Sequence, residues 1–109
     1  MRGRIMNKYH AKRTYSELNS RWFSSKLEAG RADELKMLEM YGNISDLEFQ
    51  KKFILSDKPK VTITVDFTYI DENGVRKYED TKGMGETREF RVKRIWLKEK
   101  HGVDILLTK

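Results

Sequence analysis

The chain has 109 residues, no cysteine and a formal net charge of +6. This length suits one small domain, the missing cysteine excludes disulfides and thiolate metal sites, and no apolar run approaches the roughly 20 residues of a membrane span. The positive charge favours a polyanionic partner such as nucleic acid, although many basic proteins bind none.

The first 13 residues carry five basic side chains and no acid, which is typical of a basic N-terminal arm. Three of these side chains, Lys8, Lys12 and Arg13, are candidate contacts to nucleic-acid phosphates. A solvated tail explains the same charges equally well. We therefore divide the chain into an arm over residues 1–13 and a single domain over residues 14–109.

A short hairpin is predicted over residues 13–23, and a helix follows it. Ser24 or Ser25 can cap this helix, its body runs over residues 27–40, and Gly42 ends it. A turn of 100° per residue places four apolar side chains on one face, which we expect to be buried: Leu27, Ala32, Leu35 and Leu38.

Glu28 falls near the middle of this apolar face, where an acid is unexpected. The run from Ser25 to Glu28 matches the S-x-x-E capping box, so a helix cap is the simpler interpretation. The other interpretation is an acid that the helix aims at the sheet. The two strand acids described below favour this second interpretation.

The next strand is predicted over roughly residues 47–55, with Gln50 on its polar side and Pro59 in the turn that follows. A strand over residues 61–69 then alternates apolar and polar side chains, so one of its faces is apolar. Asp66 lies on the polar face, in the middle of this strand. An acid there is costly without a partner, so Asp66 requires an explanation.

The turn after this strand decides which acid lies opposite Asp66. The sequence Asp-Glu-Asn-Gly at residues 71–74 fits a type I turn, and a left-handed glycine would make it a three-residue loop with a bulge. Asp66 then lies opposite Asp80, with Lys82 on the same face. A two-residue turn would shift the register by one residue and bring Glu79 to that face instead. We favour the first register.

A second helix is predicted over residues 88–101, capped by Thr87 and ended by Gly102, and a final strand over residues 103–107. Apolar contacts to the core are expected from Phe90, Ile95, Trp96 and Leu97. The helix is strongly basic, and although such a row is usually a solvated face, beside an acidic site it could hold a phosphate backbone. The candidate nucleic-acid contacts are Arg91, Lys93 and Arg94.

The predicted order is helix, three strands, helix and strand, with acids on the first helix, the second strand and the third. Glu28, Asp66 and the run Asp80-Thr81-Lys82 in this order resemble the PD-(D/E)xK nuclease superfamily and its αβββαβ core. The chain is more similar still to a family of small phage proteins of formerly unknown function. Val65 departs from the superfamily pattern, which has proline before the first Asp. The phage-family similarity spans nearly the whole chain, at residues 8–10 (KYH), 23–29 (FSSKLEA), 44–50 (ISDLEFQ), 66–69 (DFTY) and 79–83 (EDTKG).

The resemblance implies an α/β fold of the restriction-endonuclease-like type, with a mixed central sheet flanked by helices. It also implies an Mg²⁺ or Mn²⁺ ion, for which carboxylate and carbonyl oxygens are suitable ligands. Lys82 would orient the attacking water or stabilise charge in the transition state, and Gln50 could contact the substrate or that water. The implied metal ligands are Glu28, Asp66, Asp80 and the carbonyl of Thr81.

The implied function is a metal-dependent phage DNA endonuclease in the bacterial host cytoplasm, with branched or Holliday-type junctions as candidate substrates. Cutting two strands of a junction requires two sites, so a homodimer is expected, and no membrane association is expected. Two alternatives stay open. The chain could bind nucleic acid without cleaving it, or it could be a structural or host-interaction protein in which Asp80 and Lys82 form only an ion pair.

Overall fold

A computed structural model describes residues 12–108. Most of the predicted basic arm, including Lys8, lies outside the described residues. The order of elements confirms the predicted helix, three strands, helix and strand after a short hairpin. The elements are β1 (Thr14–Ser16), β2 (Arg21–Phe23), α1 (Lys26–Met40), β3 (Ser45–Asp57), β4 (Lys60–Ile70), β5 (Arg76–Thr81), α2 (Arg88–His101) and β6 (Leu106–Thr108).

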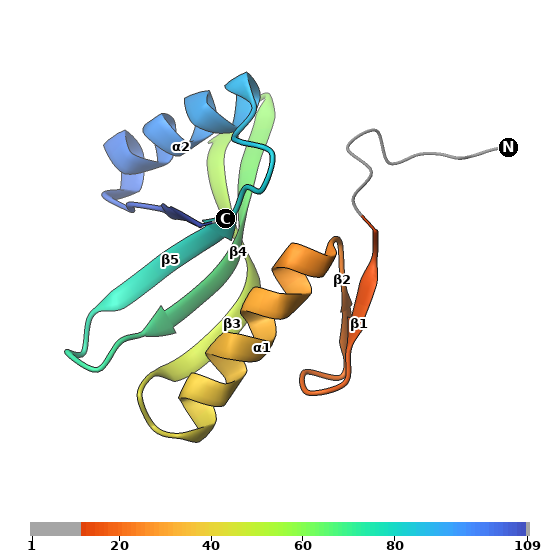
Figure 1. The fold of residues 1–109 in the computed structure, drawn as a ribbon. Helices are drawn as coiled ribbons and strands as arrows, with labels where there is room; N and C mark the ends of the chain where they lie inside the picture. The colour runs from red at the N-terminus through yellow and green to blue at the C-terminus, as the bar shows by residue number, and fades with distance from the viewer. Residues whose placement is uncertain (1–11, 109) are drawn as a thin grey trace, which may run out of the picture.

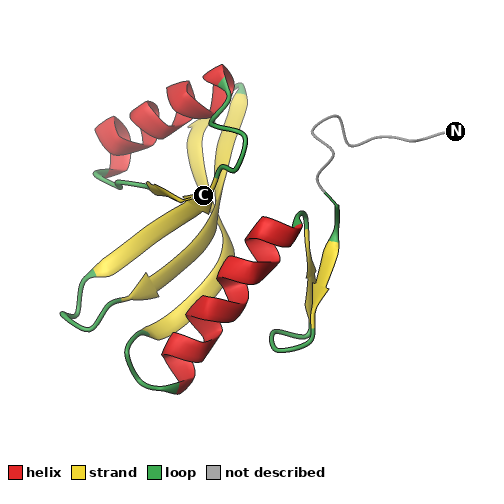
Figure 2. Cartoon of the chain, viewed as in Figure 1, coloured by secondary structure: helices red, strands yellow, loops and turns green. Residues whose placement is uncertain are grey.

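The strands form two sheets, and α1 lies between them (Figures 1 and 2). The β1–β2 hairpin is a two-stranded antiparallel sheet, and the main sheet has the order β3-β4-β5-β6. In the main sheet β3, β4 and β5 are antiparallel, whereas β6 is parallel to β5. The predicted class, α/β with a mixed sheet and two helices, is therefore confirmed.

Two apolar clusters hold the helices against the long β3–β4 hairpin. The first cluster joins Ala32 and Leu35 of α1 to Phe67 of β4, and the second joins Leu97 of α2 to Ile63 of β4. Strand β4 therefore serves both clusters along its length. Asp66 lies between Ile63 and Phe67 in this strand, with its side chain on the opposite face from these two apolar residues.

The buried face of α1 is shifted from the predicted one, and that of α2 is narrower than predicted. In α1, Ala32 and Leu35 are buried as predicted, but Leu27 is 39% exposed and Leu38 is 36% exposed, whereas Ala29 is buried. In α2 only Leu97 is buried, and Ile95 and Trp96 are exposed.

The last strand is shorter than predicted and begins later, at Leu106 rather than Val103. Val103 and Ile105 pack against the second cluster from irregular backbone. Their apolar character is thus explained by packing below α2, and only three residues pair with β5.

The β4–β5 turn has the predicted form. Gly74 is left-handed, with φ of 79°, and its amide donates to the carbonyl of Asp71 at 2.9 Å. The Asp71 amide donates to the carbonyl of Val75 at 2.9 Å, which closes a three-residue loop with a bulge. The resulting register pairs Phe67 with Glu79, so Asp66 lies opposite Asp80 as predicted.

This register sends Glu79 to the other face of the sheet, against α1. Arg31 of α1 binds it with two hydrogen bonds, from Nε to Oε2 at 2.5 Å and from Nη2 to Oε1 at 3.0 Å. The hydroxyl of Tyr69 donates to Oε1 at 2.9 Å, and the Glu79 side chain is 0% exposed. The buried charge is therefore compensated, and the pairing ties α1 to β4 and β5.

Replacing Arg31 with methionine should lower the free energy of unfolding by about 3 kcal/mol, because it leaves the Glu79 carboxylate buried without a counter-charge. Urea denaturation measures this loss. Glu34 also pairs with Arg31, but its side chain is 67% exposed, so Glu34→Gln should change stability by less than about 0.5 kcal/mol. Equal effects of the two substitutions would show that Glu79 does not anchor α1.

Candidate active site

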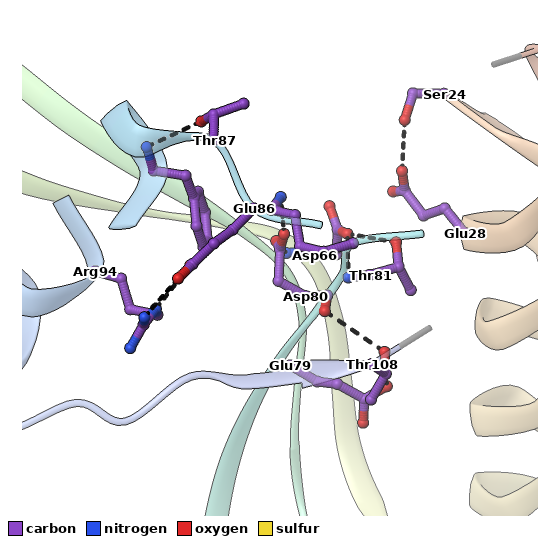
Figure 3. A network of polar contacts seen from close by, with 12 residues as sticks. Ser24, Glu28, Asp66, Glu79, Asp80, Thr81, Glu86, Thr87, Arg94 and Thr108 are labelled. Carbon is purple, nitrogen blue, oxygen red and sulfur yellow. Dashed lines mark hydrogen bonds and ion pairs between the residues drawn. The ribbon is translucent and has the colours of Figure 1, made fainter. Parts of the chain in front are cut away.

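Asp66 and Asp80 face one another on β4 and β5 (Figure 3). The backbone amide of Asp66 donates to Oδ1 of Asp80 at 2.9 Å. Oδ2 of Asp66 accepts from both the amide and the hydroxyl of Thr81, each at 3.0 Å. Thr81 thus orients Asp66 through groups that the sequence did not single out, since only its carbonyl was predicted to act.

Lys82 is held at the edge of this pair by two contacts. Its Nζ forms an ion pair with Oδ2 of Asp80 and lies 4.0 Å from the ring centroid of Phe90. Phe90 stands in the first turn of α2, so α2 limits where the ammonium can go. The sequence had assigned Phe90 only to the core.

The start of α1 lies against the end of β5. A Cβ added at Gly83 would come 2.8 Å from Cδ2 of Leu27, so only glycine permits this approach without a shift of that side chain. Ser25 caps α1, its Oγ accepting from the Glu28 amide at 3.0 Å. The predicted cap is therefore present, but it uses the backbone of Glu28 and not its carboxylate.

The Glu28 carboxylate belongs to the site instead. Oε1 accepts from the hydroxyl of Ser24 at 2.6 Å (Figure 3). Oε2 accepts from Nε2 of Gln50 at 2.8 Å. Glu28 is 3% exposed, as expected for an acid in the middle of the buried face of the helix. It has no cationic hydrogen-bond partner among the described residues, unlike Glu79.

Gln50 lies opposite Asp66, because its neighbours Phe49 and Lys51 pair with Phe67 and Val65. Its φ of 56° is in the left-handed region, which costs a residue other than glycine about 1 kcal/mol or more. Backbone strain of this kind is concentrated at functional sites. Gln50 therefore joins Asp66 and Asp80 in one row across three strands.

Glu28, Asp66 and Asp80 together carry more negative charge than the single ammonium of Lys82 can balance. Burial raises the pKa of Asp80 to about 6, with a further contribution from the charge of Asp66, and the contact with Lys82 opposes both. Burial also raises the pKa of Glu28, against the hydrogen bond from Ser24. A cation at this position would relieve both effects.

Ser24, Glu28 and Asp66 line two hollows at once. The larger hollow, of about 720 Å³, also contains Lys82 and runs toward the start of α2. The smaller hollow, of about 310 Å³, runs toward the β1–β2 hairpin and contains Gln50. The acids thus stand where two surface depressions meet.

Within residues 12–108, no three His, Cys, Asp or Glu side chains are placed as a group that could hold a metal ion. In this arrangement Asp80 contacts Lys82, and Glu28 accepts a hydrogen bond from Gln50. The donors themselves are carboxylate oxygens, which suit Mg²⁺ or Mn²⁺. Side-chain rotation is therefore needed before these residues could bind such an ion.

The predicted basic contacts on α2 are all paired with acids. Arg91 and Arg94 both bind Glu86, and Lys93 binds Glu89 at 3.1 Å. The two arginines lower the pKa of Glu86 to about 2, Arg94 contributing more. Of the predicted arm contacts within the described range, Lys12 is exposed and Arg13 lies over Trp22.

Comparison with known proteins matches one family. Residues 6–108 match the family described as Protein of unknown function (DUF1064). No match was found among curated proteins or among solved structures. In the part of the chain that the structure describes, no helix is long and apolar enough to cross a membrane.

Replacing Glu28 with glutamine and replacing Glu79 with glutamine should affect the free energy of unfolding differently. In chelator, Glu28→Gln should leave the free energy of unfolding unchanged within about 1 kcal/mol or raise it, because the substitution removes a buried charge that has no cation bound to it. Glu79→Gln should lower it by about 3 kcal/mol, because Arg31 loses its counter-charge. Urea titrations compare the two variants. A loss at Glu28 as large as that at Glu79 would make Glu28 a structural acid.

Proposed function

We propose that this chain, which belongs to the DUF1064 family, is a metal-dependent DNA endonuclease with a restriction-endonuclease-like αβββαβ core. The observation that carries the proposal is that Glu28 and Asp66 both line two hollows, while buried Asp80 lies behind them, bonded to the Asp66 amide and to Lys82. The element order and the mixed sheet support the assignment of the core.

The same residues are suited to hold a divalent cation. Glu28, Asp66 and Asp80 would supply carboxylate oxygens to Mg²⁺ or Mn²⁺, and Thr81 its carbonyl. Their burial and mutual repulsion support this role, because a cation would offset the excess negative charge. When bound, such an ion generates a nucleophilic hydroxide from water and neutralises charge on the scissile phosphate.

Lys82 and Gln50 would position the substrate and the attacking water. Phe90 and Asp80 hold the Lys82 ammonium at the wall of the larger hollow, where it would bind a phosphate oxygen or the water. The amide of Gln50 already donates to Glu28, so it can keep that carboxylate directed into the site. Both side chains lie in the site before any substrate arrives, and their contacts with Asp80 and Glu28 would rearrange when the cation binds.

The biological setting proposed here follows from the phage-family resemblance. Branched or Holliday-type junction DNA in the cytoplasm of an infected bacterium would be the substrate. Symmetric cleavage of a junction requires two sites, which a homodimer would supply. Sedimentation with and without junction DNA checks this, and a monomer under both conditions contradicts symmetric resolution.

A second candidate function is nucleic-acid binding without cleavage. It is favoured by the internal pairing of the acids, because Lys82, Gln50 and Thr81 already satisfy Asp80, Glu28 and Asp66. A protein that lost catalysis would keep such contacts as structural bonds.

Cleavage of labelled duplex, single-strand, flap and four-way-junction DNA separates the two functions. With Mg²⁺ or Mn²⁺ the wild type should cut at least one substrate, and Asp80→Asn and Lys82→Ala should each lower the rate by about 100-fold or more. Lys98→Ala, which removes an exposed ammonium paired with Asp104, is the matched control and should retain activity. Absence of cutting with every metal and substrate, by a folded protein, would favour the second candidate.

Metal binding has a readout that does not depend on cleavage. Mn²⁺ at roughly ten times its Kd should stabilise the wild type by about 1.4 kcal/mol, measured as a rise in Tm. Asp80→Asn should abolish the rise, whereas Asp104→Asn should retain it. A rise of equal size in the Asp80 variant would locate the cation elsewhere.

A further inference from the structure

We infer that the β1–β2 hairpin is a stacking platform for unpaired bases, and that it holds a single-stranded segment of DNA beside the acids. The inference rests on the proposed function and specifies its substrate class. The platform consists of Tyr15 and Trp22, with Arg13 over the Trp22 ring, and Arg21 lies over Phe49 in the smaller hollow that Trp22 also lines. Tyr15, Trp22 and the two arginines do not belong to the metal-binding or cleaving groups proposed above.

Two aromatic rings are presented outward from the hairpin. Tyr15 and Trp22 are direct cross-strand partners, with ring centroids 5.4 Å apart in an edge-to-face arrangement. Tyr15 is 45% exposed and Trp22 is 54% exposed, although neighbouring Phe23 and Ser16 are buried against α1. Exposed rings of this kind stack nucleic-acid bases, which bury the ring faces without requiring a particular sequence.

The positive charge beside these rings is free to meet phosphate. Arg13 lies 5.1 Å from the ring centroid of Trp22, and Arg21 lies 5.0 Å from that of Phe49. Among residues 12–108 neither arginine forms an ion pair with an acid. This distinguishes them from Arg91, Lys93 and Arg94 of α2, which pair with Glu86 and Glu89.

The platform leads directly into the proposed site. Arg13, Arg21 and Trp22 line the smaller hollow, which also contains Glu28 and Asp66. A strand stacked on the hairpin would therefore continue across these acids into the larger hollow, where Lys82 and Lys93 stand. One continuous depression thus connects Trp22 of the platform with the carboxylates.

The hairpin is also fixed in place, as a platform must be. The hydroxyl of Ser16 donates to Oδ1 of Asp33 on α1 at 2.5 Å, and Nδ2 of Asn19 donates to the same oxygen at 3.2 Å. Phe23 packs into the first apolar cluster and against Phe49. Because Asp33 and Glu28 both lie on α1, the rings of the hairpin keep their orientation relative to Glu28.

Unpaired bases fit this surface better than a regular duplex does. In a duplex both faces of each base are already stacked, so an aromatic pair gains little contact from it. At a junction, flap or single-strand region a base can leave its neighbours and stack on Trp22. The platform therefore selects DNA that has an unpaired segment next to the phosphate to be cut.

The test uses the two tryptophans of the chain as reporters. The variant Trp96→Phe leaves Trp22 as the only tryptophan. In chelator, a 12-nucleotide oligothymidine should quench its fluorescence saturably, and a blunt 12-base-pair duplex at the same concentration should not. Trp22→Ala should weaken oligothymidine binding at least about fivefold, Trp22→Tyr should retain most of it, and Trp96→Ala should change it less than about twofold.

A second experiment tests whether Arg21 contacts a phosphate, with Arg88 as the control. Arg21→Ala should weaken oligothymidine binding and reduce the salt dependence of log K by about 0.7, the value for one phosphate contact to a single strand. Arg88→Ala removes an exposed arginine from α2 and should change neither quantity. Circular dichroism confirms that each variant is folded.

Two outcomes overturn the platform. In the first, Trp22→Ala and Trp96→Ala weaken oligothymidine binding equally. In the second, the duplex quenches the Trp22 fluorescence as strongly as oligothymidine does. Metal-dependent cleavage measured on the same proteins separates this failure from failure of the nuclease proposal. Cleavage without quenching retains the nuclease and rejects the platform, whereas quenching without cleavage retains the platform on a binding protein.

Discussion

The register between β4 and β5 is the constraint on which the candidate site depends. A bulged three-residue loop with left-handed Gly74 sets this register, and Asp66 and Asp80 consequently share one face. Glu79, the neighbour of Asp80, is sent to the opposite face, where Arg31 binds it. Because side chains alternate along a strand, a slip by one residue would exchange the two acids. It would place Asp80 under α1, facing Arg31, and bring Glu79 to the site.

The acids at the two faces differ in how their charge is balanced. Glu79 is fully buried and meets a guanidinium with two hydrogen bonds, which is the arrangement of a structural ion pair. Glu28 is nearly as buried but receives only a hydroxyl and an amide. Asp80 shares one ammonium, that of Lys82, with a second nearby acid. Retaining undercompensated carboxylates in a small domain is costly, and the cost is understandable if the residues bind a cation and a phosphate.

Basic charge on this chain is divided between two surfaces with different surroundings. On α2, Arg91, Lys93 and Arg94 pair with Glu86 and Glu89, so these three side chains meet acids before they could meet a phosphate. On the hairpin, Arg13 and Arg21 lie over aromatic rings without an acidic partner in the described range. A count of Lys and Arg cannot separate these cases, since ion pairing between residues depends on where the folded backbone places them. The hairpin, which looked incidental in the sequence, is therefore the better candidate for contact with nucleic acid.

Local patterns in the sequence predicted the order of elements and the end of each helix, and narrowed the cap of the first helix to two serines and the β4–β5 register to two forms, of which the favoured one is present. Each depends on residues close in the chain, whose preferred backbone angles and alternation act without the rest of the fold. Tertiary structure alone decided that Ala29, and not Leu27 or Leu38, completes the buried face of α1, and what the Glu28 carboxylate contacts. It also decided the left-handed backbone of Gln50 and the pairing of Arg91, Lys93 and Arg94 with acids. These features depend on contacts between elements far apart in sequence, where the geometry of packing, and not local propensity, sets the energy.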